Sequence, residues 1–440
     1  MDIEKNDMLN IFKDFLRIPT ISAERKNLMD GATFLNKFLN SIGIKSKIIG
    51  NKDAPVVYGE YNINAEKTLL IYNHYDVQPV DPVNEWSNDP FNPVIINNRI
   101  YARGAADNKG ALMSRLYGIY HAIKNDDLHV NLKFLYEGEE EIGSPSLEDF
   151  VLSNKDLLKS DGLLMEGSTI DVNGRPVIYL GVKGLLYVQL TDEIGDSDLH
   201  SSNAPVVPNP IWEIVLNLSK LYDGEKIKIP GFYDDIKQLS DKEIEILKNF
   251  PLKMEDYMKS FKLRRLKYSN DYEIVKALYT EPTFNIDGVY GGYSGPGSKT
   301  VIPRLAGIKI DFRLVPDQDP NKIFKAFEES LRSNGFTGEI KILSSEYPVR
   351  TSPDSEMAKS ITKSAKTVFK LDPVVNINMP GTQPMALFTK NLGITEAASA
   401  IDPRDNKLSN WHAPNESISI NNFYIAAKHM HEFLKIYHAE

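Results

Sequence analysis

The sequence predicts an α/β protein with two domains, in which a mostly parallel sheet forms one domain and an α+β insertion forms the other. Two observations predict this. In the first part of the chain, short apolar runs end in polar residues and alternate with helical patterns, which is typical of a parallel α/β sheet. In the middle, two longer segments alternate apolar and polar residues, as half-buried strands do. The 440 residues allow one to three domains at roughly 150 residues each.

The expected elements of the first domain follow one another in a regular order. Three apolar runs, each followed by polar residues, predict buried strands: Leu69–Tyr72, Leu132–Tyr136 and Leu163–Met165. Three helical patterns lie before and between these strands: residues 12–20, 30–42 and 108–125. Because the carboxyl ends of parallel strands meet at one edge of a sheet, we expect the polar residues after these strands to lie together.

The middle of the chain predicts the inserted domain. Residues 181–194 and 304–317 have the alternating pattern of strands, VPNPIWEIVLNLSKLYD predicts a helix, and residues 223 to 280 look charged and irregular. SLRSNGFTGEIKILSSEYPV predicts a helix end, a turn and a strand, whereas SEMAKSITKSAKTVF and NNFYIAAKHMHEFLKIY predict helices of the first domain. The expected boundaries are 1–183 and 349–440 for the two segments of the first domain, and 184–348 for the insertion.

Composition excludes several classes of protein. Hydrophobic residues make up 42% and charged residues 25%, which excludes a disordered or collagen-like chain. The net charge of −9 argues against a nucleic-acid or anionic-membrane partner. No apolar run approaches the roughly 20 residues of a membrane span, and the N-terminus lacks the pattern of a signal peptide. Cysteine is absent, so any metal is held by oxygen and nitrogen ligands. We expect a cytoplasmic location.

His74 is the first candidate metal ligand. It follows the apolar run Leu69–Tyr72 and stands two residues before Asp76, so that alternation places both side chains on the same side of the strand end. A carboxylate beside an imidazole fixes the tautomer of the ring and makes it a better metal ligand. The alternative for these two residues is an ordinary surface loop.

Carboxylates in later segments add to this pattern. Asp107 in RGAADNKGAL either caps the following helix or bridges two metal ions with its two oxygens. The glutamates of EGEEEIGS either form a solvated acidic loop or divide two tasks, with Glu140 and Glu141 as general base and metal ligand. Glu166 follows the third apolar run, and His412 lies in SNWHAPNES near the C-terminus.

Charge counting favours two divalent cations at such a site. Three carboxylates, from Asp107, Glu141 and Glu166, together with a hydroxide would neutralise two such ions, and a neutral site is easier to bury. Oxygen and nitrogen ligands without thiolates suit Zn, with Mn or Co as alternatives. Two ions about 3.5–4 Å apart activate a water molecule and polarise a carbonyl group.

The motifs HYDVQP, ARGAADNKG, EGEEEIGS, GLLME and WHAPNE occur in this order, and together they resemble a known family. The sequence is similar to the dinuclear metallopeptidases that include carnosine-type dipeptidases, glutamate carboxypeptidase, aminoacylase, acetylornithine deacetylase and succinyl-diaminopimelate desuccinylase. The resemblance covers nearly the whole chain. It implies a catalytic domain of the zinc-peptidase type, and an inserted domain that serves as a lid and as a dimer contact.

The resemblance also implies a role for each site residue. His74 and Glu166 would be the terminal ligands of one metal, Glu141 and His412 those of the other, and Asp107 the bridge. Asp76 would orient His74, and Glu140 would be the general base. His200 in DLHSS would reach the active site of the partner subunit and stabilise the oxyanion. The residues implied to bind substrate are Thr300, Arg313, Gly381 and Thr382.

These inferences predict metal-dependent hydrolysis of an amide bond in dipeptides or small peptides with a free C-terminal carboxylate. The runner-up is an N-acyl amino acid deacylase of the acetylornithine deacetylase or succinyl-diaminopimelate desuccinylase type. Glu166 favours this alternative, because carnosine-type dipeptidases usually have Asp at that position. The assignment of Glu166 assumes a one-residue shift, since an ungapped register from GVKG would place Gly167 there. A non-catalytic metal-binding protein is a remote alternative. A phosphate-ester hydrolase also ranks low, because the catalytic segments have no glycine-rich phosphate loop.

Overall fold

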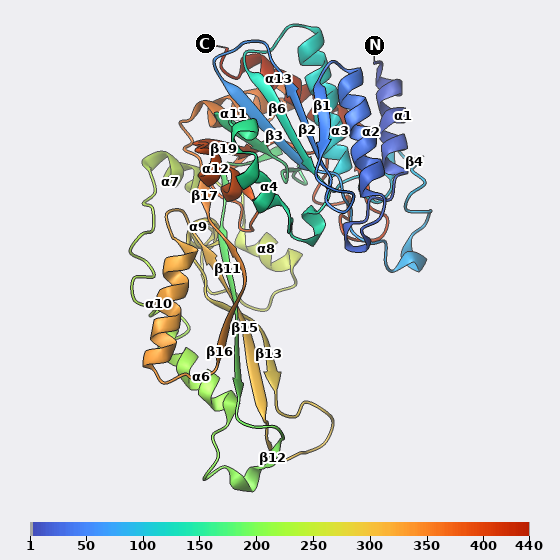
Figure 1. Ribbon diagram of the computed structural model, residues 1–440. Coiled ribbons are helices and arrows are strands. Elements are labelled where there is room, and N and C mark those ends of the chain that lie inside the picture. The colour runs from blue at the N-terminus through green and yellow to red at the C-terminus, as the bar shows by residue number, and fades with distance from the viewer. Residues whose placement is uncertain (1–2, 440) are drawn as a thin grey trace. The chain divides into compact units, whose positions relative to one another are not determined.

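The computed structural model describes residues 3–439 and contains two compact units (Figure 1). The first unit comprises the chain up to Gly181, Thr351–Ile377 and the chain from Leu387 onward. The second comprises Val182–Arg350 and Asn378–Ala386. The sequence analysis assigned all of residues 349–440 to the first domain, so Asn378–Ala386 differ from that expectation. No helix within the described residues combines the length and apolar character that a membrane-spanning helix requires.

A nine-stranded sheet forms the centre of the first unit within the described residues. The strands in spatial order are β1 (Lys45–Ile49), β2 (Val56–Tyr61), β6 (Asn131–Glu137), β3 (Thr68–His74), β7 (Gly162–Met165), β19 (Glu396–Ser399), β9 (Pro176–Tyr179) and β18 (Val374–Asn376), with β8 (Thr169–Ile170) paired to β9. The four neighbours β6, β3, β7 and β19 are parallel. The prediction of a mostly parallel central sheet is therefore confirmed.

Helices and a small sheet complete the first unit. The helices are α1 (Lys5–Leu16), α2 (Leu28–Ser41), α3 (Lys109–Lys124), α4 (Leu147–Ser153), α5 (Lys155–Leu158), α11 (Glu356–Phe369), α12 (Met385–Leu392) and α13 (Ile420–Ile436). The small sheet joins β20 (Ser417–Ser419), β5 (Arg99–Tyr101) and β4 (Val94–Ile96). Helix α1 ends at Leu16 rather than at residue 20, because Pro19 disfavours helical backbone at the residue before it. Figure 1 shows α1 and α2, in blue, side by side, and the rings of Phe15 and Phe34 stack between them with centroids 4.8 Å apart.

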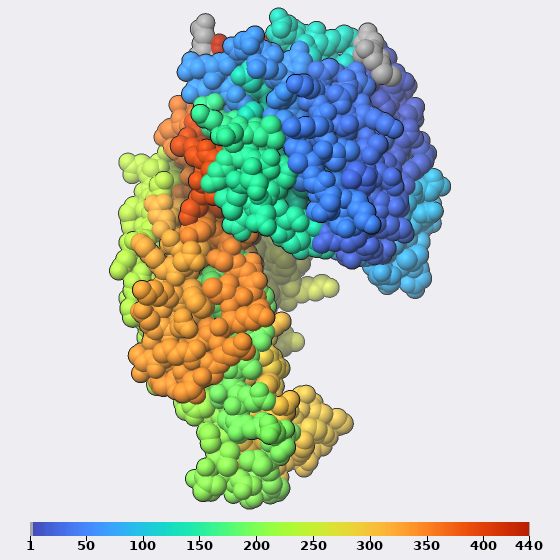
Figure 2. All heavy atoms as spheres, in the orientation of Figure 1, coloured from blue at the N-terminus to red at the C-terminus, as the bar shows by residue number. Residues whose placement is uncertain are grey.

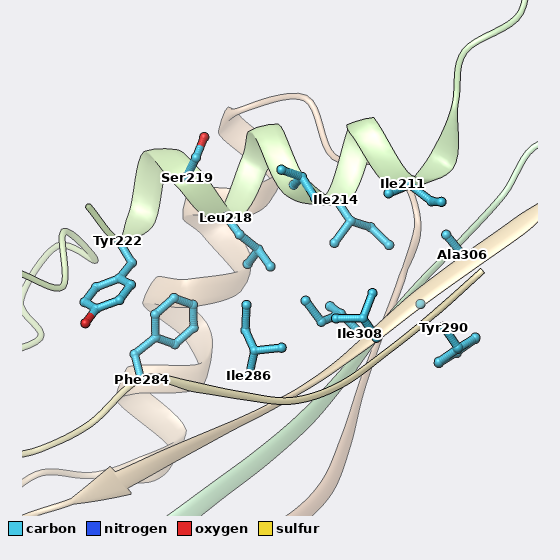
Figure 3. Close-up of a pocket in the computed structure, with 13 residues that line it drawn as sticks. Ile211, Ile214, Leu218, Ser219, Tyr222, Phe284, Ile286, Tyr290, Ala306 and Ile308 are labelled. Atoms are coloured by element: carbon cyan, nitrogen blue, oxygen red, sulfur yellow. The ribbon is translucent and has the colours of Figure 1, made fainter. Parts of the chain in front are cut away.

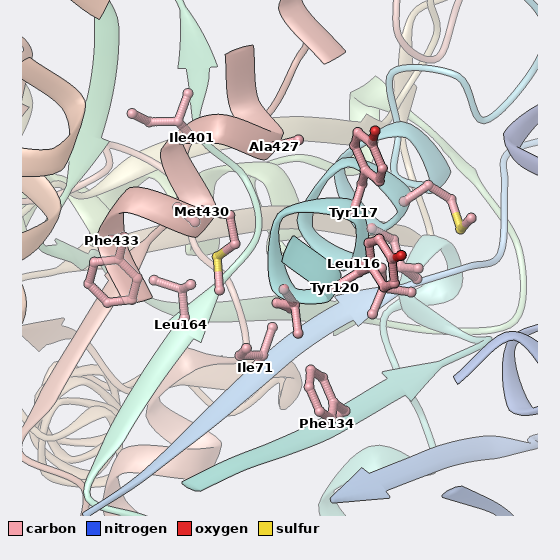
Figure 4. Close-up of a cluster of buried hydrophobic side chains, with 14 of the residues drawn as sticks. Ile71, Leu116, Tyr117, Tyr120, Phe134, Leu164, Ile401, Ala427, Met430 and Phe433 are labelled. Atoms are coloured by element: carbon pink, nitrogen blue, oxygen red, sulfur yellow. The ribbon is translucent and has the colours of Figure 1, made fainter. Parts of the chain in front are cut away.

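Helix α3 is buried on nearly every side in the core of the first unit. Helix α3 packs against α13, and Figure 4 shows Met430 and Phe433 of α13 in the same cluster as Ile71 of β3 and Leu164 of β7. The close approach of the two helices requires glycine at position 118, since a Cβ atom there would lie 2.3 Å from the carbonyl oxygen of Ala427. The buried helix α3 follows directly after the segment that contains Asp107.

The second unit is built on an antiparallel sheet of four strands within the described residues, in the order β13 (Asn285–Gly291), β15 (Leu305–Leu314), β11 (Gly184–Glu193) and β16 (Glu339–Glu346). Buried and partly exposed residues alternate along β11, as its sequence predicts. Helices α6 (Pro210–Leu221) and α10 (Pro320–Ser333) contribute Leu218 and Phe327 to the core with Phe312 of β15. Figure 2 shows α10, in orange, at the surface of this unit. The short pairs are β10 (Gly181–Val182) with β17 (Val349–Arg350), and β12 (Leu199–His200) with β14 (Val301–Ile302).

The expectation of an irregular segment between residues 223 and 280 is wrong. The structure has three short helices there: α7 (Asp241–Lys248), α8 (Met254–Ser260) and α9 (Asp271–Thr280). Capping residues define two of them, because Ser240 forms a capping box with Glu243, and the Asn270 side chain accepts a hydrogen bond from the Glu273 amide. These helices are short and bury few residues, and the capping residues Ser240 and Asn270 mark in the sequence where two of them begin.

Candidate metal centre

The predicted ligands come from strand ends that the sheet places next to each other. Strand β3 ends at His74, which lies opposite Glu137 at the end of the parallel strand β6. On its other side β3 pairs with β7, which is followed directly by Glu166. All residues from Leu69 to His74 are buried, so the apolar run fixes the strand and delivers His74 at its carboxyl end. The acidic loop after β6 contains Glu140 and Glu141.

A first group of candidate ligands consists of His74, Asp107 and Glu166, all buried. His74 Nε2 lies 3.3 Å from Asp107 Oδ1 and 3.9 Å from Glu166 Oε2. One ligand atom from each residue lies within 4.8 Å of the other two. The Asn108 side-chain amide donates a hydrogen bond to Glu166 Oε2 and so orients that carboxylate.

A second group consists of Asp107, Glu141 and His412. His412 Nε2 lies 3.2 Å from Asp107 Oδ2 and 3.2 Å from Glu141 Oε2. Asp107 therefore presents one oxygen to each group. The other Glu141 oxygen, Oε1, is buried and has no hydrogen-bond partner among the described residues. Burying a carboxylate oxygen without a hydrogen-bond partner destabilises the folded protein, and a bound cation would offset that loss of stability.

The pKa values in the centre reflect several carboxylates buried together. Burial raises the pKa of Glu140; the nearby His74 opposes the shift, and Glu166, Asp107 and Glu141 add to it. Burial likewise raises the pKa of Glu166 to about 7. The pKa of His412 rises to about 10 because it forms hydrogen bonds with Asp107 and Glu141. This concentration of carboxylates with two imidazoles and no thiolate fits divalent cations such as Zn, Mn or Co.

Asp76 holds two parts of the centre at once. Its Oδ1 lies 3.3 Å from His74 Nδ1, on the side of the ring that faces away from Asp107. The same carboxylate accepts hydrogen bonds from the backbone amides of Glu140 at 3.2 Å and Glu141 at 3.0 Å. The sequence predicted only the contact with His74. Asp76 is fully buried, so the acidic loop is fixed to the end of β3 by a carboxylate that solvent does not reach.

Glu416 is a further buried carboxylate, to which the sequence analysis assigned no role. It accepts hydrogen bonds from Arg103 at 2.7 Å and from the backbone amides of Gly104, Ala106 and Asp107 at 3.1, 2.7 and 2.9 Å. Glu416 thus determines the path of the loop that presents Asp107. The motif WHAPNE contained this residue, but its partners lie more than 300 positions away in the sequence.

Arg404 is the second residue that sequence reasoning missed. Its guanidinium NH1 lies 3.5 Å from Asp107 Oδ2. The residue belongs to the irregular segment between β19 and β20, and the motif WHAPNE later in that segment does not include it. Arg404 therefore adds a positive charge to a centre that otherwise gathers carboxylates.

The residues implied to bind substrate lie in the second unit and form two small sets. His200 on β12 and Thr300 are exposed, and Thr300 Oγ1 lies 3.3 Å from His200 Nε2. In the other set, Arg313 NH1 donates a hydrogen bond to Thr382 Oγ1 at 2.9 Å. Gly381 and Thr382 were expected in the first domain, but they belong to the second unit, because Lys183 bonds with both.

The chain is similar to known metallopeptidases and dipeptidases. The model of a family described as Peptidase family M20/M25/M40 matches residues 70–436. The chain is 26% identical to the Beta-Ala-His dipeptidase of Mus musculus over 457 residues, which cover 97% of this chain and 92% of that protein. It is 31% identical to a Cys-Gly metallodipeptidase of Schizosaccharomyces pombe over 350 residues, which cover 75% of this chain and 73% of that protein.

A solved structure matches the whole chain. An M20 family metallo-carboxypeptidase from Sulfolobus solfataricus superimposes with a TM-score of 0.91 at 49% sequence identity, and the match covers 100% of each chain. The similarity therefore extends over both units.

Proposed function

The chain belongs to the Peptidase family M20/M25/M40, and on this premise we propose that it hydrolyses dipeptides or other small peptides that have a free C-terminal carboxylate. The family resemblance and the prediction of a metal-dependent peptidase are confirmed. The observation that carries the proposal further is the position of Asp107, which offers one oxygen to each of two groups of candidate ligands.

The residues that would hold two divalent cations are those of the two groups. His74, Asp107 and Glu166 would bind one ion, and Asp107, Glu141 and His412 the other. When bound, the ions activate a water molecule and polarise the scissile carbonyl group. Zn is the ion we expect, with Mn or Co as alternatives.

Glu140 is the residue that we propose to move the proton. Its Oε2 lies 3.8 Å from His74 Nε2, and its side chain is 27% exposed, so it is beside the ligands and remains accessible. The raised pKa of this carboxyl makes it a better base, which suits it to take a proton from the attacking water. The same proton would then pass to the leaving amine. Asp76 would keep Glu140 in place through the hydrogen bond to its amide.

Selectivity for a free carboxylate is assigned to the second unit. Arg313 is 35% exposed, and its Nε lies 3.2 Å from Asp311 Oδ2, so its guanidinium is both accessible and oriented. A guanidinium binds a carboxylate through two parallel hydrogen bonds. We propose that Arg313 binds the substrate carboxylate together with Gly381 and Thr382, that Thr300 joins them from the partner subunit with the neighbouring His200, and that His200 stabilises the oxyanion.

We further propose a homodimer in which His200 acts on the active site of the partner. An exposed apolar surface supports association: Trp212 on α6 and Val289 on β13 are 60% and 66% exposed. The neighbouring groove has a volume of about 250 Å³ and is lined by Ile214, Leu218 and Ile308. Figure 3 shows these side chains between α6 and the strands β13 and β15.

Mixing inactive variants tests the trans assignment. His200→Ala and Glu140→Ala homodimers should each be nearly inactive. After subunit exchange, a mixed dimer has one site with both substitutions and one intact site. Random pairing of equal amounts makes half of the dimers mixed, so about a quarter of all sites should recover. No recovery despite demonstrated exchange would exclude the action of His200 in trans.

A substrate panel tests the proposed reaction. Metal-free protein is reconstituted with Zn, Mn or Co and assayed on dipeptides, dipeptide amides and N-acyl amino acids. We expect cleavage of the dipeptides and none with the metal-free protein. Glu166, a glutamate where carnosine-type dipeptidases usually have aspartate, favours the deacylase alternative, and preferential cleavage of N-acyl amino acids would establish it. Binding of metal without any turnover would indicate the non-catalytic alternative. The cytoplasmic location remains a prediction, which cell fractionation tests.

A further inference from the structure

Arg404 places a permanent positive charge beside the carboxylate that the two ligand groups share. Its NH1 lies 3.5 Å from Asp107 Oδ2, the oxygen that also lies 3.2 Å from His412 Nε2. The side chain of Arg404 is 12% exposed. A guanidinium does not lose its proton in proteins. The oxygen that Asp107 offers to the second group is therefore faced by a cation that belongs to the chain.

The guanidinium of Arg404 is fixed in this position. Its Nε donates a hydrogen bond of 2.8 Å to the carbonyl oxygen of Ser168, and its Cζ lies over the ring of Trp411, 5.3 Å from the ring centroid. A cation over an indole ring is attracted by the negative face of the ring. The backbone of Arg404 is also held in place, because its carbonyl oxygen accepts a hydrogen bond from the amide of Ile170 at 2.9 Å.

The two ligand groups consequently differ in their surroundings. The first group is buried throughout, and His74 is 1% exposed. The second group includes His412, which is 51% exposed, and shares its Asp107 oxygen with Arg404. An ion in the second group would meet both repulsion from a like charge at close range and competition from water.

We propose that Arg404 competes with the second cation for Asp107 Oδ2, so that the chain binds its two ions with unequal affinity. The ion held by Asp107, Glu141 and His412 is the weaker one and exchanges more readily. Without that ion, Arg404 remains the cation that faces Asp107 Oδ2. The inference rests on the proposed function, because it requires that both groups bind ions.

Titration of metal-free protein with Zn²⁺ against a chromophoric chelator tests this inference. Wild type should bind two ions in separate steps. Arg404→Met removes the charge and keeps an unbranched stem against Trp411, so the weaker ion should bind at least ~10-fold more tightly. Tighter binding is a result that general damage to the site would not produce. Arg404→Lys keeps a charge and should retain unequal binding.

Arg99→Met is the matched control. Arg99 is also 12% exposed and pairs with Asp405 at 2.9 Å, so this substitution removes the same charge from a similarly buried position outside the ligand groups. It should leave the affinities unchanged. If Arg404→Met does not fold, Arg404→Gln carries the same expectation and can still bond to Ser168.

The outcomes separate this inference from the proposed function. Equal affinities in wild type would overturn the inference, as would unchanged or weaker binding in Arg404→Met or Arg404→Gln. If Arg99→Met raised the affinity for the weaker ion as much as Arg404→Met does, the change in net charge alone would explain the effect. That result would also overturn the inference. Wild type that binds fewer than two ions would instead contradict the proposed two-ion function.

Discussion

The two units hold their candidate functional residues in opposite ways. In the first unit, His74, Asp76 and Glu166 are buried, and buried carboxylates fix the loops around them. In the second unit, His200 and Thr300 are exposed and contact each other at the tip of two-residue strands. The difference indicates a division of labour: the first unit maintains a rigid, charged centre, and the second presents accessible groups for recognition. Substitutions in the first unit should therefore abolish function, whereas those in the second should change affinity and selectivity.

The largest effect is expected from Asp107→Ala. Because Asp107 offers an oxygen to both ligand groups, its loss should remove more metal than the loss of His74 or His412. Elemental analysis after dialysis measures the number of ions per chain in the three alanine variants. If Asp107→Ala retained two ions per chain, Asp107 would not be a ligand common to both groups. The first unit would then depend less on its buried residues than the comparison of the two units implies.

Glu140→Gln should have the next largest effect. The change preserves the size of the side chain but removes the group that accepts the proton, so turnover should fall by at least ~10²-fold while the metal content stays the same. Steady-state kinetics and elemental analysis check both expectations. Glu148→Gln is the matched control, since Glu148 is exposed on α4 and should tolerate the same change. Near-normal turnover in Glu140→Gln would remove Glu140 from the mechanism.

Arg313→Ala should alter selectivity more than catalysis. A hydrogen-bonded ion pair contributes about 1.5–3 kcal/mol, which corresponds to a preference of roughly 10- to 100-fold for acids over amides. The ratio of kcat/KM for a dipeptide and its amide should be this large in wild type and close to unity in Arg313→Ala. Equal cleavage of the acid and the amide by wild type would refute the assignment of Arg313. It would show that the second unit does not bind the C-terminal carboxylate of the substrate.

The smallest effect is expected in the capping box of α7. Ser240→Ala removes the side chain that accepts a hydrogen bond from the Glu243 amide, which should cost about 1 kcal/mol. Faster hydrogen exchange at the first turn of α7, with unchanged metal content, is the expected result. Ser333→Ala provides the control, because the Ser333 hydroxyl donates to a carbonyl oxygen at the end of α10 and caps no amide. Protection of α7 unchanged by Ser240→Ala would show that tertiary packing alone holds this helix.

The sequence predicted those parts of the protein that local patterns determine. The apolar run before His74 identified β3, and the alternating residues of 181–194 and 304–317 identified β11 and β15. The proximity of the strand ends followed from the rule that parallel strands share a carboxyl edge. Arg404 and Glu416 could not be predicted in this way, because their positions depend on contacts between segments that are far apart in the chain.

The position of Glu416 has a consequence for the order in which the protein acquires its structure. The amides of Gly104, Ala106 and Asp107 bond to a carboxylate that is synthesised more than 300 residues later, after the whole second unit. A nascent chain on the ribosome cannot form these bonds until the segment with Glu416 has emerged. The loop with Asp107 is therefore among the last parts of the first unit to reach its final conformation, and the candidate metal centre matures only after the segment with Glu416 has been synthesised.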